Sequence, residues 1–161
     1  LSRGGADIPI TVERPTEGRL VAAKLVDYTL GLFASRAYAA RHGLPATLGE
    51  LKRHRLIGYV ADLLISLSLD YGPEIMPDWQ ASFAVSSALG QLEAVRSGAG
   101  IGILHTFIAR SHDDLVPVPV APPIRRAYWL VYHETVRPLR RVQAVSSFIA
   151  AAVEAERASF V

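Results

Sequence analysis

Apolar and polar residues alternate along the chain with two periods, one typical of strands and one typical of helices. Alternating or unbroken apolar runs predict strands at 7–12, 20–26, 28–33, 56–60, 79–85, 101–104, 115–120 and 125–133. Apolar residues spaced three to four apart predict helices at 36–42, 48–54, 88–97 and 139–158. Pro9 has no backbone N–H, so the first strand is expected at a sheet edge. Strands that alternate with helices predict an α/β fold with mainly parallel pairing.

Residues 86–105 are the most informative stretch, because they combine a helix start, a glycine turn and a buried strand. Ser86 or Ser87 is expected to cap the helix by accepting a hydrogen bond from a first-turn N–H. Glycines at 98 and 100 are expected to end the helix and turn the chain back. The apolar helix face consists of Leu89, Leu92 and Val95. A capped helix start at the end of a strand is a natural anion site, so both serines are candidate anion ligands.

Large apolar side chains indicate where the core lies. The C-terminal helix carries one apolar face, formed by Val142, Val145, Phe148, Ile149, Ala152 and Val153. Four large aromatic residues are expected in the core: Phe33, Trp79, Trp129 and Phe148. Two further capping serines or threonines are expected: Ser35 before the helix at 36–42, and Thr47 before the helix at 48–54. Glu50 would complete a capping box with Thr47.

Composition limits the class of protein. The chain has 161 residues, of which 50% are apolar and 20% charged, enough for one substantial domain or two small lobes. The net charge of +2 does not indicate nucleic-acid binding by this chain. One loose basic region is interpreted as solvated helix faces; it contains Arg36, Arg41, Lys52, Arg53 and Arg55. The absence of cysteine excludes disulfides, thiolate zinc sites and thiol nucleophiles. No signal peptide or membrane span is recognisable, so a cytoplasmic protein is expected.

Candidate catalytic and cofactor motifs do not have the required geometry. The glycines at 98, 100 and 102 follow a helix and precede a strand, which is the reverse of a dinucleotide-binding loop. Residues 111–114 (Ser-His-Asp-Asp) are adjacent and cannot form a nucleophile–base–acid triad. The five histidines lack metal-ligand spacing, and no cofactor is predicted. His105 stands apart, because it follows the buried strand and can face a cleft.

Five passages, taken in order, carry a family resemblance. They are Gly4–Ile10, with a glycine-x-x-aspartate strand in which Pro9 is unusual; Leu25–Tyr38; His42–Pro45 with Leu48–Leu51; Ser86–Leu104; and Tyr128–Tyr132 with the last helix. In this order they resemble the effector-binding domain of LysR-type transcriptional regulators, a two-lobed relative of the periplasmic binding proteins. The resemblance covers nearly the whole chain, from residue 4 to 156.

The resemblance implies a two-lobed α/β domain with an effector cleft between the lobes. Residues 1–33 and 126–161 would form an incomplete first lobe, and 34–125 the second lobe. A small, anionic organic effector would contact Val85, Ser86, Ser87 and His105. The hinge would lie at Phe33, Ala34, Arg126 and Ala127. The intact protein is expected to be a homodimer or homotetramer that binds DNA through another domain, with no catalytic residue and no metal.

The chain departs from the family pattern at its beginning. The winged helix-turn-helix and the first strand-helix-strand-helix unit of the effector domain are missing, so the chain is expected to be an N-terminally truncated piece. Two other classes stay open at this point. A solute-binding protein of a transport system shares the fold, and a small enzyme would require a catalytic constellation that the sequence does not offer.

Overall fold

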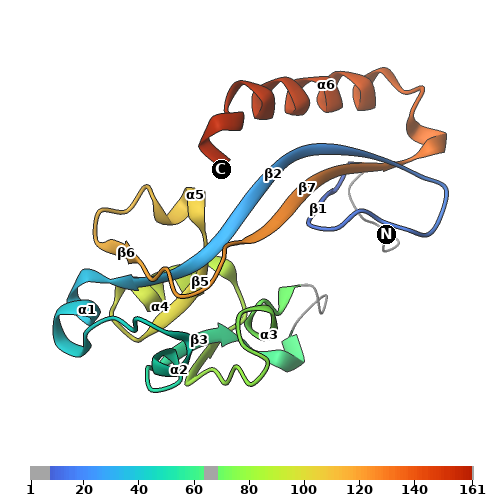
Figure 1. Cartoon of the computed structure of the whole chain (residues 1–161). Coiled ribbons are helices and arrows are strands. Elements are labelled where there is room, and N and C mark those ends of the chain that lie inside the picture. The colour runs from blue at the N-terminus through green and yellow to red at the C-terminus, as the bar shows by residue number, and fades with distance from the viewer. Residues whose placement is uncertain (1–7, 64–68, 161) are drawn as a thin grey trace. The chain divides into compact units, whose positions relative to one another are not determined.

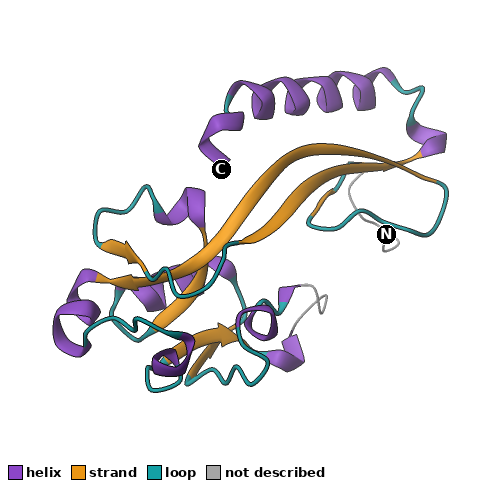
Figure 2. Ribbon diagram, viewed as in Figure 1, coloured by secondary structure: helices purple, strands orange, loops and turns teal. Residues whose placement is uncertain are grey.

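The computed structural model describes residues 8–63 and 69–160, and the chain forms two compact units (Figures 1 and 2). Unit 1 consists of Leu1–Tyr28 and Arg125–Val161, and unit 2 consists of Thr29–Ile124. The predicted α/β class is confirmed, because strands and helices alternate through most of the chain. The assignment of 1–33 with 126–161 and of 34–125 to the lobes of the family stays a prediction. The glycine-x-x-aspartate motif at 4–7 lies outside the described residues.

The strands are β1 (Ile10–Thr11), β2 (Leu20–Ser35), β3 (Leu56–Tyr59), β4 (Phe83–Val85), β5 (Ile101–His105), β6 (Leu115–Pro117) and β7 (Ile124–His133). The α-helices are α1 (Arg36–His42), α2 (Leu48–Leu51), α3 (Gly72–Ile75), α4 (Ala88–Arg96), α5 (Thr106–Ala109) and α6 (Arg140–Ala155). Short 3₁₀ helices are η1 (Ala61–Leu63), η3 (Glu134–Val136) and η4 (Arg157–Phe160).

The sheet is mixed, so the prediction of mainly parallel pairing is wrong. β3 pairs parallel with β4 and β5, whereas β2 pairs antiparallel with β5 and β6. In unit 1, β1 pairs antiparallel with β7, at the sheet edge that Pro9 predicted. The parallel part consists of β4, β3 and β5, and α4 forms the crossover from β4 to β5, which lie on opposite sides of β3.

Unit 2 has its core where α4 packs on β3 and β5. The residues in this cluster are Phe33, Ile57, Leu92, Ala94, Val95, Leu104, Ala109 and Leu115. The sequence assigned Leu92 and Val95 to this face correctly, whereas Leu89 is 66% exposed. Leu89 lies in the first turn of α4, so it projects beyond the end of the helix face that covers the sheet.

Unit 1 places α6 beside β2 and β7, and only part of the predicted apolar face of α6 is covered. Val142 is buried and Ile149 packs on the Leu25–Val26–Leu130 cluster. Phe148 is 74% exposed, so its prediction as a core residue is wrong. Consecutive residues of an α-helix are rotated by about 100° around its axis, so Phe148 points in a different direction from Ile149. The cluster that covers Ile149 does not extend to the side of α6 that carries Phe148. Tyr28 and Tyr128 stack in this unit with ring centroids 4.3 Å apart.

Several element boundaries differ from the predictions. Residues 20–33 form one continuous strand rather than two, because Asp27 points to solvent in an otherwise regular strand. The strand expected at 79–85 is reduced to β4, and the helix expected at 48–54 ends at Leu51. The predicted glycine turn is formed by Gly98 alone, whose φ is +80°.

The three expected helix caps are present, and of the two serines proposed for the third cap, Ser86 and Ser87, it is Ser87 that caps. The side chains of Ser35, Thr47 and Ser87 accept hydrogen bonds from the third residue of their helices. Glu50 bonds the backbone N–H of Ala46 at 2.7 Å rather than that of Thr47, so the capping box is shifted by one residue. These caps mark where α1, α2 and α4 begin, and α4 is the helix that borders the candidate site.

Candidate functional site

The first turn of α4 presents backbone donors to its surroundings. Ser87 adopts an extended conformation, and its Oγ accepts the Gly90 N–H at 3.1 Å. The N–H groups of Ala88 and Leu89 donate to no group among the described residues. Positive charge at a helix N-terminus attracts anions. The turn lies close against β4, since a Cβ placed on Gly90 would be 2.4 Å from Cγ1 of Val85.

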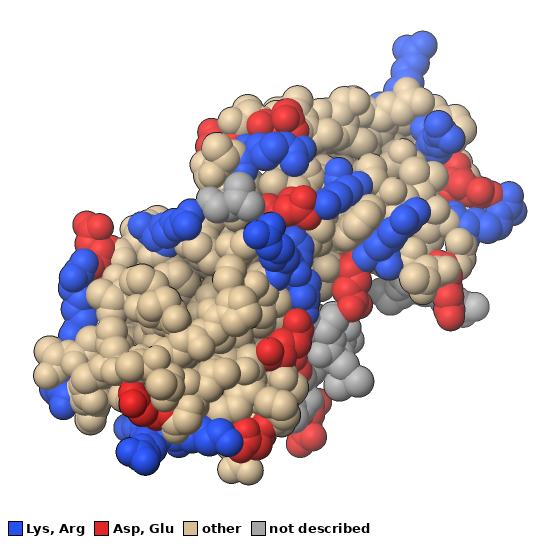
Figure 3. All heavy atoms as spheres, in the orientation of Figure 1, with Lys and Arg blue, Asp and Glu red and all other residues tan. Residues whose placement is uncertain are grey.

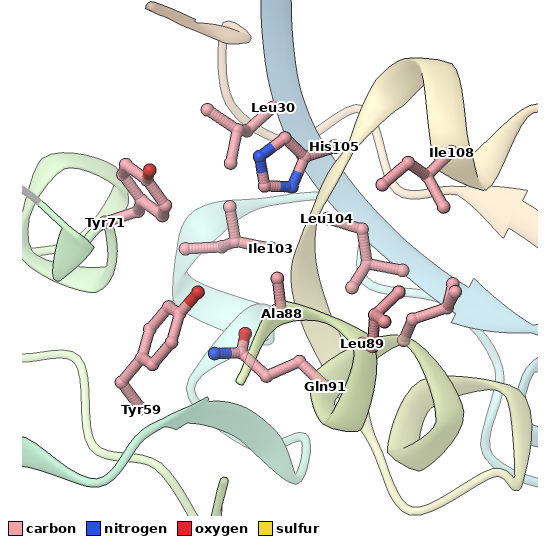
Figure 4. Close-up of a pocket in the computed structure, with 11 residues that line it drawn as sticks. Leu30, Tyr59, Tyr71, Ala88, Leu89, Gln91, Ile103, Leu104, His105 and Ile108 are labelled. Atoms are coloured by element: carbon pink, nitrogen blue, oxygen red, sulfur yellow. The ribbon is translucent and has the colours of Figure 1, made fainter. Parts of the chain in front are cut away.

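Beside this turn lies a small cavity, here called the Gln91 pocket (Figure 4). It belongs entirely to unit 2 and has a volume of about 10 Å³, room for one water-sized group. Its lining consists of Leu30, Tyr59, Tyr71, Ala88, Leu89, Gln91, Leu92, Ile103, Leu104, His105 and Ile108. No Lys, Arg, Asp or Glu is among these described lining residues.

Gln91 is the unusual member of this lining. It is only 3% exposed, and its Nε2 has no hydrogen-bond partner in the described part of the chain. Figure 4 shows the amide end of Gln91 directed toward Tyr59 and Ile103, into the pocket. A buried amide donor without a partner costs about 1–3 kcal/mol. A ligand that offers an acceptor would therefore remove a penalty that the free protein bears.

His105 ends β5 and contributes an imidazole to the same pocket. Burial lowers its pKa from the usual value, because the charged imidazolium loses hydration in the pocket. His105 is thus neutral at pH 7, with one ring nitrogen able to donate and the other able to accept. Its ring meets Phe107 edge to face, with centroids 5.7 Å apart.

We expect acid to destabilise the folded chain through His105. Below about pH 6.5 the unfolded chain binds a proton at this histidine while the folded chain resists it, so stability falls as pH decreases. The His105→Gln variant removes this titration and should lose less stability between pH 7 and about 5. Urea unfolding at a series of pH values measures the difference. If the unfolding free energies of variant and parent depended equally on pH, His105 would not be the source of the acid sensitivity. Burial also lowers the pKa of His54, so His54 contributes to the pH dependence of stability that remains in the His105→Gln variant.

The structure brings only some of the sequence-predicted site residues together. His105 faces the Gln91 pocket, whereas Val85 lines a separate apolar depression with Phe83 and Gly90. Ser86 and Ser87 are exposed and precede α4, next to the pocket residue Ala88. The role of these four residues in binding stays a prediction.

The predicted hinge residues lie in regular strands. Phe33 pairs with Gly102 and Pro117, and Ala34 pairs with Val116. Arg126 and Ala127 lie near the start of β7. The boundaries between the compact units fall at Tyr28–Thr29 and Ile124–Arg125. A hinge function for these four residues stays a prediction.

The motifs rejected for catalysis have structural roles. The Ser111 hydroxyl donates to the Ile108 carbonyl at 2.7 Å, and Asp114 pairs with Arg96 at 3.0 Å. No group of three His, Asp or Glu that could hold a metal ion occurs within 8–63 and 69–160. None of the described helices is long and apolar enough to cross a membrane.

The expected basic region is dispersed over solvated surface. Arg36 donates to the Asp113 carbonyl, Arg41 to the Ala37 carbonyl, and Lys52 pairs with Asp78. Figure 3 shows Lys and Arg interspersed with Asp and Glu on the face drawn.

Sequence reasoning missed Gln91, Tyr59 and Tyr71. The sequence does contain a sign of Gln91, because this polar residue falls next to Ala88 and Leu92 on the side of the helix that is expected to be buried. Tyr71 lies in a segment without clear periodicity, where Gly72 and Pro73 start the short helix α3. Its position in the pocket depends on tertiary contacts that no local pattern encodes.

Several solved structures share the fold of this chain. The CrgA regulatory domain from Neisseria meningitidis aligns with a TM-score of 0.77 at 20% identity, over 91% of this chain and 75% of that chain. The AmpR effector domain of Pseudomonas aeruginosa aligns with a TM-score of 0.70 at 19% identity, over 96% and 74% of the two chains. Full-length AphB of Vibrio cholerae gives 0.71 at 19% identity, over 91% and 51%. The fold is therefore that of the periplasmic-binding-protein-like effector domains.

The family assignment follows from the sequence itself. The LysR substrate binding domain family matches residues 1–154, and the chain belongs to that family. No curated protein matches the chain. The chain is thus a LysR-type effector-binding domain, and it spans only about half of the full-length CrgA and AphB chains, 52% and 51%. The expectation of a LysR-type effector domain is confirmed.

Proposed function

We propose that unit 2 binds a small organic effector at the Gln91 pocket and the adjoining first turn of α4, and that binding controls transcription by the whole regulator. The observation that carries this proposal is the buried Gln91 amide, which has no partner among the described residues and points into the pocket. The pocket holds one water-sized group, so part of the effector lies outside it, along the exposed side chain of Leu89.

The effector carries an anionic group in this proposal. The N–H groups of Ala88 and Leu89 are available at the positive end of α4, and the hydroxyls of Ser86 and Ser87 are exposed beside them. A carboxylate can accept from these donors while another acceptor of the same molecule reaches Gln91. His105 contributes as a neutral hydrogen-bonding group.

The test is a thermal-shift screen of the chain with small carboxylates, sugars and amino acids, followed by titration of each hit. The Gln91→Leu variant should bind a hit about tenfold more weakly or worse, while its own unfolding temperature stays equal or rises. The rise follows because leucine removes a buried donor that has no partner in the described structure.

Gln143→Leu is the matched control, since Gln143 lies on α6 in unit 1 and is exposed. It should leave hit affinity unchanged. Ser86→Ala and Ser87→Ala should weaken binding of anionic hits. Undiminished binding by Gln91→Leu would place the effector elsewhere and refute the proposal.

The whole protein is proposed to bind DNA through another domain, to form a homodimer or homotetramer and to act in the cytoplasm. The family match and the full-length CrgA and AphB regulators support these points. They also favour a regulator over a transport-type solute-binding protein. Binding without catalysis is proposed, because the described lining of the pocket presents a neutral imidazole and an amide, and it includes no Ser or Thr beside the imidazole that could act as a nucleophile.

A further inference from the structure

A second hollow adjoins the Gln91 pocket and is here called the Tyr71 hollow. Both spaces are lined by Tyr59, Tyr71, Gln91 and Ile103, so the two are neighbours within unit 2. The hollow also has a volume of about 10 Å³. It fits one water-sized polar group at the end of a larger ligand, and it is too small for a ring.

Aromatic side chains form much of the wall of this hollow. Tyr59, Tyr71 and Trp79 line it, and Tyr71 is buried. Trp79 is held against two glycines: a Cβ on Gly72 would be 2.5 Å from its Cγ, and a Cβ on Gly58 would be 3.3 Å from its Nε1. The wall is therefore fixed by close backbone contact. Faces of aromatic rings attract cations, most strongly where water is excluded.

The charge of the hollow is negative. Asp70 is the only Asp, Glu, Lys or Arg among the described residues that line either space. Its carboxylate forms no ion pair or hydrogen bond among the described residues. Burial lowers the pKa of His105, and burial and Tyr71 raise the pKa of Tyr59, so both side chains are neutral at pH 7. The described lining of the hollow thus combines one carboxylate, three aromatic rings and the Gln91 amide, and it includes no Lys or Arg.

We propose that the Tyr71 hollow binds the ammonium group of a small organic amine, with Asp70 as the counter-ion and Tyr59, Tyr71 and Trp79 as the surrounding rings. This inference rests on the proposed function, because it names a second chemical group of the effector. With an anionic group at the start of α4, the effector is a zwitterion. An ammonium group has the size and the charge that the hollow selects, whereas a carboxylate there would face Asp70.

A series of four-carbon compounds tests the inference on the full 161-residue chain. The probes are butylamine, 4-aminobutyrate, butyrate and 1-butanol, and the readout is the indole N–H signal of Trp79 in ¹H–¹⁵N spectra. Trp129 lies in unit 1 and provides an internal reference. Both amine-bearing probes should shift the Trp79 signal, and 1-butanol and butyrate should leave it in place.

Two variants sharpen the test. Asp70→Asn should weaken amine binding at least about tenfold, because it removes the one acidic side chain among the described lining residues while keeping the size of the side chain. Asp62→Asn changes an exposed acid nearby in the sequence and should have no effect. A Trp79 shift of equal size with 1-butanol, or equal amine affinity in Asp70→Asn, overturns the inference, as does the absence of any shift with the amines.

The outcomes separate this inference from the proposed function. If butyrate binds the parent chain but not Gln91→Leu, and the amines do not shift the Trp79 signal, the effector site is supported and the ammonium hollow is refuted. If 4-aminobutyrate binds through Asp70 equally tightly to the parent chain and to Gln91→Leu, the hollow is supported and the role of Gln91 is refuted.

Discussion

Gly100→Ala is expected to destabilise unit 2 by about 2–4 kcal/mol. A Cβ at this position would lie 2.3 Å from the carbonyl oxygen of Arg55 and 2.9 Å from its carbonyl carbon. That oxygen accepts the Ile101 N–H at 2.8 Å, where β5 begins to pair with β3. Overpacking costs about 1–3 kcal/mol and the displaced hydrogen bond about 1 kcal/mol more.

Gly49→Ala is the matched control, with an expected effect of opposite sign. A Cβ at position 49 would contact only Thr47 Oγ1, at 3.8 Å, and the backbone of Gly49 is helical. Alanine should therefore stabilise by about 0.4–1 kcal/mol. Urea unfolding in a Trp129→Phe background follows unit 2 through the fluorescence of Trp79. Equal stability of Gly100→Ala and the parent would show that the Arg55 backbone moves freely, contrary to the packing described.

Leu92→Ala should cost about 2–5 kcal/mol, while Leu89→Ala should change stability by less than about 0.5 kcal/mol. Both variants remove the same atoms from α4. Leu92 is 5% exposed and packs in the main cluster of unit 2, so its loss leaves a cavity. Leu89 is 66% exposed, and solvent replaces its side chain.

Unfolding free energies of these two variants, measured by the same Trp79 fluorescence, check the expectation. Similar losses in both would mean that Leu89 is covered in solution. Because Leu89 borders the Gln91 pocket, its variant should alter effector affinity while leaving stability intact. Leu92→Ala affects both, and the comparison thus separates packing from binding on one helix.

Local patterns predicted most elements of unit 2 and their caps. Ser35, Thr47 and the pair Ser86 and Ser87 identified helix starts correctly, because capping depends on side chain and backbone within four residues. Which serine of the pair is the cap, Ser87, is seen only in the structure. The pairing direction was missed, because it depends on contacts between segments far apart in sequence, such as Leu32 with Ile103. Phe148 was misplaced for a related reason: helical spacing identifies an apolar face without showing how much of it is covered.

The candidate site was predicted only in part. The start of α4 and His105 were found from a helix cap and a strand end, which are local features. Tyr59, Tyr71 and Asp70 come from β3 and from the aperiodic segment before α3, and only the folded chain brings them near Gln91. A buried glutamine is detectable in sequence, but its lack of a partner is a property of the surrounding fold.

The close contact between Gly90 and Val85 has a consequence for how this site can evolve. A side chain at 90 would collide with β4, so the position of the helix start is fixed by the absence of a Cβ. Residues 89 and 91, on either side of it, carry side chains into the pocket lining. Mutation at these two positions can change ligand preference while the backbone donors stay in place, so related domains can acquire new effectors without rebuilding the fold.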